Sequence, residues 1–344
     1  MSCVSAASVL AALDPARYDV IAVGITPGGT WVLADGPRAG LPAGVQAVPH
    51  SLAASGPVLD PLATLAPEET DPDLDVAPTV VLPLLHGPLG EDGTVQGLLE
   101  LSGTAYVGAG VLGSALCMDK AKAKEVLAAA GLPQARYVAW RDGSDRALLS
   151  RQVDDELGWP VFVKPANLGS SVGISRVDGP ADFDAAVDVG LAYDEWLVVE
   201  EAITGRELEC GVLGNVHFET SVPGEIVPSA RFYDFDDKYS GTGAELVVPA
   251  RLPEDVADWL RCMAVAAATA LRAEGMARVD FFYEEAGRGL LINEANTIPG
   301  FTPQSMFPRL WEASGVSYTE LLDRLVGLAL ARHARRSSRL GRAR

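Results

Sequence analysis

The chain is poor in cysteine and in positive charge. Cys3, Cys117, Cys210 and Cys262 lie far apart in 344 residues and form no C-x-x-C pair. This spacing indicates reduced thiols rather than a disulfide framework or a zinc site. Lysine and arginine number 27 against 46 acids, a formal net charge of −19. The deficit excludes a general nucleic-acid or anionic-membrane surface, because both require a basic footprint.

Long hydrophobic runs are absent as well. The sequence contains no run of 18 apolar residues, and it does not open with a secretory signal. We therefore expect a cytoplasmic protein whose partners are small molecules, with no nucleic acid and no membrane among them. A chain of 344 residues is long enough for two or three domains.

Lysine is also rare, because arginine supplies most of the positive charge. The five lysines are Lys120, Lys122, Lys124, Lys164 and Lys238. A lysine is a compact point charge, whereas arginine is a planar fork, and phosphate sites often use the former. Each lysine is therefore a candidate for a phosphate site.

Helical and strand patterns alternate along the chain, which is typical of an α/β fold. A helix is expected over 2 to 13 and a buried strand over 18 to 26. A second strand over 79 to 87 runs into a loop rich in glycine and acid, and a helix begins near Thr94. Later helices are expected at 118–131, 145–157, 181–190, 254–273 and from about 318, and later strands at 159–166 and 195–203.

The stretch "ARVDFFYEEAGRGLLINEAN" predicts two strands joined by a turn. Since successive side chains of a strand point to opposite faces, Arg278 and Asp280 share one face, and Glu294 and Asn296 share one face of the partner strand. Carboxylate and amide oxygens suit a hard divalent cation such as Mg²⁺. The alternative is an edge hairpin with a charged outer face.

Two further segments carry polar residues at strand ends. In "VFVKPANLGSSVG", Lys164 closes an apolar strand before a Gly/Ser turn, which can surround phosphate oxygens with N–H groups and hydroxyls. In "VVEEAITGRE", Glu200 and Glu201 end a buried strand, where acids are costly unless one faces a ligand or water. The alternatives are a plain surface hairpin and a strand that runs into solvent.

In order and spacing, these three segments resemble the nucleotide- and metal-binding parts of the ATP-grasp fold. With "HGPLGEDGTVQG" and "FYDFDDKYS" added, the chain resembles D-alanine–D-alanine ligases from Ser2 to about residue 330. The resemblance implies an α/β fold in which an N-terminal doubly wound (preATP-grasp) domain precedes a two-part ATP-grasp module. The implied boundaries are 1–117 for the N-terminal domain, 118–208 and 209–332 for the two ATP-grasp subdomains, and 333–344 for a basic tail. We expect that tail to be disordered.

The resemblance also implies a role for individual residues. Metal ions would be held by Asp280, Glu294 and Asn296. The catalytic group would comprise Arg278, Ser170, Tyr239 and His86. ATP would be bound by Lys120, Lys164, Ser170, Ser171, Glu200, Ile203, Glu207 and Lys238. The amino-acid substrates would be bound by His86, Tyr239, Arg278, Gly300 and Ser305.

The activity implied by the resemblance is the ATP-dependent joining of two D-alanines for peptidoglycan synthesis. ATP would convert the first D-alanine to an acyl phosphate, with two Mg²⁺ (or Mn²⁺) ions and a closing loop that contains Lys238 and Tyr239. The family suggests a homodimer. Two alternatives stay open: a ligase that uses D-lactate as second substrate, which the "KYS" of the loop disfavours, and a catalytically impaired ATP-grasp protein.

The start of the chain departs from the family pattern. A doubly wound domain begins with a strand, a Gly-rich turn and a helix, whereas Met1 leads directly into a helical pattern. In the family the first loop carries a glutamate that joins a serine and a tyrosine, here matched by Ser170 and Tyr239. We therefore expect Met1 to be an internal start of a chain that is longer by one strand and loop. The alternative is a true short form that binds the first D-alanine poorly.

Overall fold

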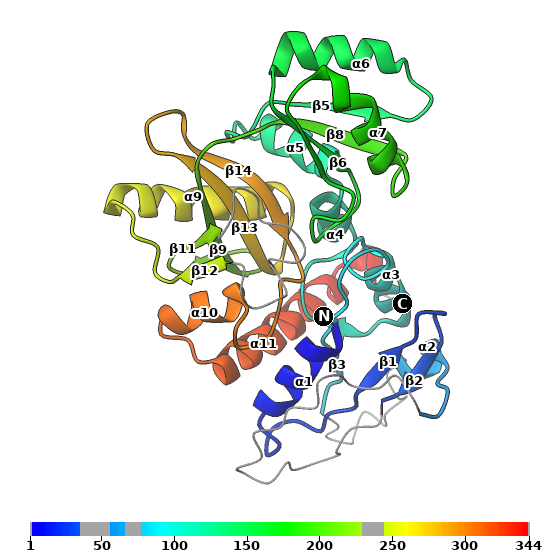
Figure 1. The fold of residues 1–344 in the computed structure, drawn as a ribbon. Coiled ribbons are helices and arrows are strands. Elements are labelled where there is room, and N and C mark those ends of the chain that lie inside the picture. Colours follow the sequence, from blue (N-terminus) through cyan, green and yellow to red (C-terminus); the bar gives the residue numbers. More distant parts are fainter. Residues whose placement is uncertain (1, 35–55, 66–76, 229–243, 343–344) are drawn as a thin grey trace.

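The computed structural model describes residues 2–34, 56–65, 77–228 and 244–342 (Figure 1). Within these ranges the strands form four sheets, two of them with only two strands each. None of the helices in these ranges has the length and apolarity needed to cross a membrane. Lys238 and Tyr239, which were expected in a closing loop, lie outside the described residues.

The N-terminal part contains two small sheets. Its elements are α1 (Ser2–Ala12), β1 (Val23–Ile25), β2 (Trp31–Leu33), α2 (Pro61–Leu65), β3 (Val80–Val81), α3 (Thr94–Ser102), β4 (Ala105–Tyr106) and α4 (Val111–Met118). The buried strand expected over 18 to 26 is wrong, because only β1 forms there and Ile21 is 66% exposed. Strand β3 is also shorter than the expected 79 to 87, and it pairs in parallel with β4.

The central part is a four-stranded antiparallel sheet, drawn at the top of Figure 1 in green and cyan. Strand β8 lies between β5 and β6, and β6 pairs with β7 across the Gly/Ser turn, as the sequence predicted. The elements are α5 (Lys120–Ala129), β5 (Tyr137–Arg141), α6 (Arg146–Gln152) with a π-helical turn (Val153–Leu157), β6 (Val161–Pro165), β7 (Ser175–Val177), a 3-10 turn (Pro180–Asp182), α7 (Phe183–Leu191) and β8 (Trp196–Glu201).

The C-terminal part is a six-stranded sheet in which β13 lies between β9 and β14, and all three pair antiparallel. The expected hairpin is therefore correct. The elements are β9 (Arg206–Gly214), β10 (Phe218–Thr220), β11 (Gly224–Pro228), β12 (Ala244–Val247), α9 (Glu254–Ala270), β13 (Gly275–Glu284), β14 (Gly289–Asn296), α10 (Met306–Ala313), α11 (Tyr318–Ser337) and a final 3-10 turn (Leu340–Arg342).

Alternation along β13 assigns its two faces to different neighbours. Val279 and Phe281 face one side and pack with Met263 and Ala267 of α9 in a core of fully buried side chains. Met276 faces the other side and packs with the aromatic residues of α10. Because the period of a strand is two, the residues that follow Met276 on its face are Arg278 and Asp280. The apolar face thus fixes where these polar residues point.

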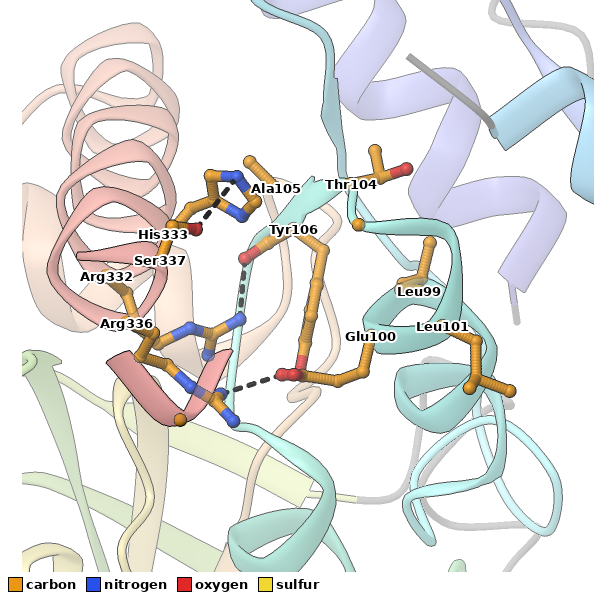
Figure 2. A pocket seen from close by; sticks show the side chains of 12 residues that line it. Leu99, Glu100, Leu101, Thr104, Ala105, Tyr106, Arg332, His333, Arg336 and Ser337 are labelled. Carbon is orange, nitrogen blue, oxygen red and sulfur yellow. Dashed lines mark hydrogen bonds and ion pairs between the residues drawn. The ribbon is translucent and has the colours of Figure 1, made fainter. Parts of the chain in front are cut away.

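The basic tail differs from the expectation of disorder, because α11 continues to Ser337. Arg332 is 3% exposed, its guanidinium donates to the main-chain oxygens of Tyr106 and Gly108, and it stacks 4.2 Å from the Tyr106 ring centroid. Figure 2 shows the hydrogen bond from Arg332 to Tyr106 beside the ion pair between Arg336 and Glu100. The helix therefore continues because its arginines find partners more than 200 residues away in the sequence.

We predict that Arg332→Met lowers the free energy of unfolding by about 1–3 kcal/mol, because it removes a buried donor from two main-chain carbonyls. Urea denaturation measures the change. Arg339→Ala, two positions beyond the helix end and exposed, is the matched control and should change stability by less than about 0.5 kcal/mol. Equal effects of the two substitutions would contradict the role given to Arg332.

Candidate active site

Three acids form a row across the largest sheet. Asp280 of β13 pairs with Glu209 of β9 on one side and with Glu294 of β14 on the other. One step along the sheet, Arg278 pairs with Asn296. A β-bulge between Asp280 and Phe281 shifts the register of β14, so that residues on both sides of the bulge keep their apolar side chains in the core. The predicted convergence of these polar groups is confirmed.

The guanidinium of Arg278 ties this row together. Its Nε and Nη2 donate to the two carboxylate oxygens of Asp280, each at 2.7 Å, and its Nε lies 3.1 Å from Oε2 of Glu209. Asn296 Nδ2 donates to Asp280 Oδ2 at 2.9 Å. Burial by itself would lower the pKa of Arg278, but the carboxylates of Asp280, Glu209 and Glu294 raise the pKa well above its usual value. Arg278 is therefore a fixed cation.

The donor set on the hairpin suits a hard cation that takes most of its ligands elsewhere. Among the described residues no three His, Cys, Asp or Glu side chains are placed to hold a metal ion by themselves. The hairpin instead offers two carboxylates and one amide, from Asp280, Glu294 and Asn296. Mg²⁺ is commonly bound by one or two carboxylates together with substrate phosphates and water. These residues fit that kind of site.

His86 and Glu91 belong to the same region. Burial, with a smaller contribution from the charge of Arg278, lowers the pKa of His86 to about 4. Burial, with a smaller contribution from the carboxylate of Glu294, raises the pKa of Glu91 to about 7, although the hydrogen bond from Gly87 acts in the opposite direction. The imidazole is therefore neutral near pH 7. Glu91, which accepts a hydrogen bond from the main chain of Gly87, was not predicted, although it lies five residues after His86 in the acidic loop.

A second cluster lies in the central sheet around Glu200, at the end of β8. Its Oε2 accepts a hydrogen bond from Lys164 Nζ of β6 at 2.9 Å, and its Oε1 lies 3.4 Å from Lys124 Nζ of α5. Burial would raise the pKa of Glu200, but the two lysines lower it to about 2. Glu200 is thus a buried carboxylate between two cations. Lys124 was not assigned to a site from the sequence.

The two adjacent acids of β8 have different partners. Glu201 accepts from Arg136 Nε at 2.8 Å and pairs with Arg288 of the β13–β14 hairpin at 2.6 Å. Both acids are buried, so the alternative of a strand end that runs into solvent is wrong. Glu201 thus connects the central sheet to the C-terminal sheet, and Glu200 is the acid that faces the lysines.

The Gly/Ser turn after β6 contains two serines in an unusual backbone conformation. Ser170 and Ser171 have φ of 56° and 59°, in the left-handed region that costs a non-glycine residue on the order of 1–3 kcal/mol. Lys120, the first residue of α5, donates from Nζ to the main-chain oxygen of Leu168 beside the turn. Strain of this kind is common where a loop is shaped for binding.

The other predicted residues lie in two places. Ile203 lies between β8 and β9, and Glu207 is the second residue of β9. Both are half-buried. Gly300 and Ser305 lie between β14 and α10, where a Cβ on Gly300 would meet Ser305 Oγ at 3.0 Å. Ser305 Oγ accepts from Thr302 N at 3.1 Å, so the segment is a tight turn.

One cavity of about 840 Å³ lies away from these residues. It is lined by α3, β4 and the C-terminal end of α11, and it contains none of the predicted site residues. Figure 2 shows that Arg332 and Arg336, the two arginines that line it, already bind Tyr106 and Glu100. We therefore place no substrate there.

Comparisons with known proteins match most of the chain to a single family. Family models described as "D-ala D-ala ligase N-terminus" and "D-ala D-ala ligase C-terminus" match residues 1–109 and 126–327. A D-alanine–D-alanine ligase of Mycobacterium sp. (strain KMS) is 49% identical over 96% of this chain and 93% of its own length. The D-alanine–D-alanine ligase of Geobacillus thermodenitrificans is 46% identical over 96% of this chain and 91% of its own length.

Solved structures agree. The D-alanine–D-alanine ligase of Coxiella burnetii has a TM-score of 0.82 and 35% identity, and the match covers 98% of this chain and 91% of that one. The VanG D-Ala:D-Ser ligase of Enterococcus faecalis has a TM-score of 0.79 and 32% identity, covering 95% and 94%. The predicted α/β fold, with an N-terminal domain before an ATP-grasp module, is confirmed.

We predict that Arg278→Met destabilises the protein by roughly 1–3 kcal/mol. Removing one partner of a fully buried ion pair costs more, but one fifth of the Arg278 side chain reaches solvent. Thermal unfolding measures the loss. Arg288→Met is the control on the same hairpin, because that side chain is 42% exposed and Glu201 keeps Arg136 as a partner. A loss of less than about 0.5 kcal/mol for Arg278→Met, as for an ordinary surface substitution, would show that the acid row does not depend on Arg278.

Proposed function

The chain belongs to the D-alanine–D-alanine ligase family, and we propose that it uses ATP to join two D-alanines into D-alanyl-D-alanine. The observation that carries the proposal is the row of Glu209, Asp280 and Glu294 around the guanidinium of Arg278. A carboxylate is a poor electrophile, so making an amide in water requires its activation. We infer that metal ions on these acids would hold the activating phosphate and that Arg278 would meet the charge that develops afterwards.

The reaction follows from that need. The carboxylate of the first D-alanine attacks the terminal phosphorus of ATP, ADP leaves, and an acyl phosphate forms. The neutral amine of the second D-alanine then attacks the carbonyl carbon, inorganic phosphate leaves as the C–O bond breaks, and the nitrogen releases one proton to solvent. Arg278 is fixed by Asp280 and Glu209, so it can stabilise the oxyanion of the tetrahedral intermediate without reorganising.

The remaining residues bind and orient. Lys120, Lys164, Ser170 and Ser171 surround the phosphates of ATP, while Glu200, Ile203 and Glu207 line the nucleoside pocket. Asp280, Glu294 and Asn296 would hold two Mg²⁺ or Mn²⁺ ions, which supply charge neutralisation on the transferring phosphoryl group. The neutral imidazole of His86 can donate a hydrogen bond to the second substrate or accept one from it. Gly300 and Ser305 receive that substrate's carboxylate, and Lys238 and Tyr239 belong to the closing loop.

The setting of the enzyme is carried over from the family. A ligase that supplies peptidoglycan precursors acts in the cytoplasm, and we propose a homodimer. Sedimentation of the purified protein tests the oligomeric state. The second substrate is the part of the proposal with a rival, because D-lactate or D-serine in place of the second D-alanine would use the same activation step.

We predict that D-alanine, ATP and Mg²⁺ give one ADP and one phosphate for each D-alanyl-D-alanine formed. Phosphate release and chromatography of the product measure this stoichiometry, with L-alanine as the control that gives none. Parallel reactions contain D-alanine with D-lactate or with D-serine. Absence of phosphate release with D-alanine would contradict the proposal. Preferential formation of the D-lactate ester or of the D-serine product would show that the second substrate is D-lactate or D-serine instead of D-alanine.

We predict further that Asp280→Asn and Glu294→Gln each lower kcat at least about 10²-fold. Each substitution replaces a negatively charged carboxylate, which would hold a metal ion beside the transferring phosphate, with a neutral amide. Steady-state kinetics over a range of Mg²⁺ concentrations measures the loss. Glu285→Gln, at the exposed turn of the same hairpin, is the matched control. Full activity of the Asp280 and Glu294 variants would contradict the proposal that the acids of the hairpin take part in the reaction.

A further inference from the structure

Lys124 is a buried cation for which the proposed reaction has no task. Its side chain is 2% exposed, and it lies on α5 with Nζ 5.4 Å from the centroid of the Tyr137 ring. Among the described residues its Nζ has no hydrogen-bond partner, and the nearest carboxylate oxygen is Glu200 Oε1 at 3.4 Å. Burying an ammonium group is costly unless an opposite charge compensates it. The position therefore needs an explanation.

Glu200 has two lysines where one would neutralise it. Lys164 Nζ is at hydrogen-bond distance, 2.9 Å from Oε2, and Lys124 Nζ is 3.4 Å from Oε1. The cluster of one carboxylate and two ammonium groups carries an excess positive charge. A second cation at this depth indicates that one of the two is needed elsewhere.

The two lysines differ in their freedom to move. The Lys164 side chain is 12% exposed and comes from β6, five residues before Gly169 of the Gly/Ser turn. The Lys124 side chain is 2% exposed and is enclosed by Glu200 and Tyr137. Lys164 can therefore rotate toward a ligand at the turn, whereas Lys124 stays beside the carboxylate.

We propose that Lys124 is a positioning residue of the nucleotide site, which keeps Glu200 neutralised so that Lys164 can exchange that carboxylate for phosphate oxygens of ATP. The inference rests on the proposed function, in which Lys164 binds phosphate. Without Lys124, transfer of Lys164 to ATP would leave Glu200 as a buried carboxylate whose remaining lysine neighbour, Lys120, is itself assigned to the phosphates of ATP. Such a carboxylate is strongly unfavourable. With Lys124 in place, its Nζ needs only a short movement to donate to Glu200.

A purely structural role for Lys124 makes a different prediction. If Lys124 only held α5 against the central sheet, its loss would disturb the whole nucleotide pocket, and adenosine and ATP would be affected alike. The exchange role concerns only ligands with phosphates. Comparison of ATP, ADP and adenosine therefore separates the two roles.

The test is Lys124→Met, with binding of ATP, ADP and adenosine measured by competition against a fluorescent ATP analogue. We expect the Kd for ATP and ADP to rise roughly 10- to 100-fold and that for adenosine to stay within about threefold. In turnover the KM for ATP should rise while kcat at saturating ATP changes little. Lys122→Met is the matched control, since Lys122 lies on the same helix with a 54% exposed side chain paired to Glu125. It should change none of these values.

A second comparison places Lys124→Met in a Glu200→Gln background. In the Glu200→Gln variant Lys164 has no ion pair to break before it binds phosphate. The added Lys124→Met should therefore not change ATP affinity. Equal weakening of ATP binding in both backgrounds, or equal weakening of adenosine and ATP, would overturn the inference. Lys124→Gln is made in parallel as a second single variant. If neither single variant folds, the Glu200→Gln and double variants are compared, and unequal ATP affinities overturn the exchange role.

Lys164→Met separates this inference from the proposed function. If it leaves ATP affinity unchanged, the phosphate role of Lys164 fails, and the inference fails with it. If Lys164→Met weakens ATP binding and Lys124→Met does not, only the inference fails. Thermal unfolding of every variant identifies losses of binding that come from loss of fold.

Discussion

The ion pairs of Arg278 with Asp280 and Glu209 are the interaction on which the candidate active site depends. Three carboxylates on adjacent strands would repel one another, and like charges directly opposite in a sheet destabilise it. The guanidinium offsets that repulsion and fixes the direction of Asp280. The apolar face of the same strands packs on α9, so the register cannot slip by one residue without burying these charges in the core.

The two polar clusters have opposite excess charges. On the C-terminal sheet three carboxylates face one guanidinium, and around Glu200 two ammonium groups face one carboxylate. A negative cluster suits metal ions and a positive cluster suits phosphate oxygens, which are the two parts of a metal nucleotide. The contacts of Glu201 with Arg136 and Arg288 link the sheets that carry the clusters. Under the proposed function, both clusters would contact the same metal nucleotide.

The sequence predicted what depends on local periodicity. Arg278, Asp280, Glu294 and Asn296 could be placed together because strand alternation and a short turn are local properties. Glu209 belongs to the same row, but its place depends on pairing with a strand 71 residues away in the chain. Lys124 was one of the five lysines singled out, yet its proximity to Glu200 depends on how α5 packs against β8.

Two of the differences between the predicted and the observed fold have similar causes. Apolar letters over 18 to 26 predicted a buried strand, but the segment lies at the surface of a two-stranded sheet. The Arg-rich end of α11 has little apolar periodicity, and its order comes from contacts with Tyr106, Gly108, Glu100 and Glu274. Both outcomes are set by tertiary partners that the local sequence does not specify.

The central claim is that the hairpin brings a substrate carboxylate to a phosphoryl group, so that the carboxylate is activated before the amine attacks. The fate of a carboxylate oxygen tests this claim most directly. With D-alanine labelled by ¹⁸O in its carboxylate, phosphorus NMR or mass spectrometry of the released phosphate should find one labelled oxygen for each dipeptide formed. Release of unlabelled phosphate, together with dipeptide formation, would contradict an acyl phosphate and the role given to the hairpin.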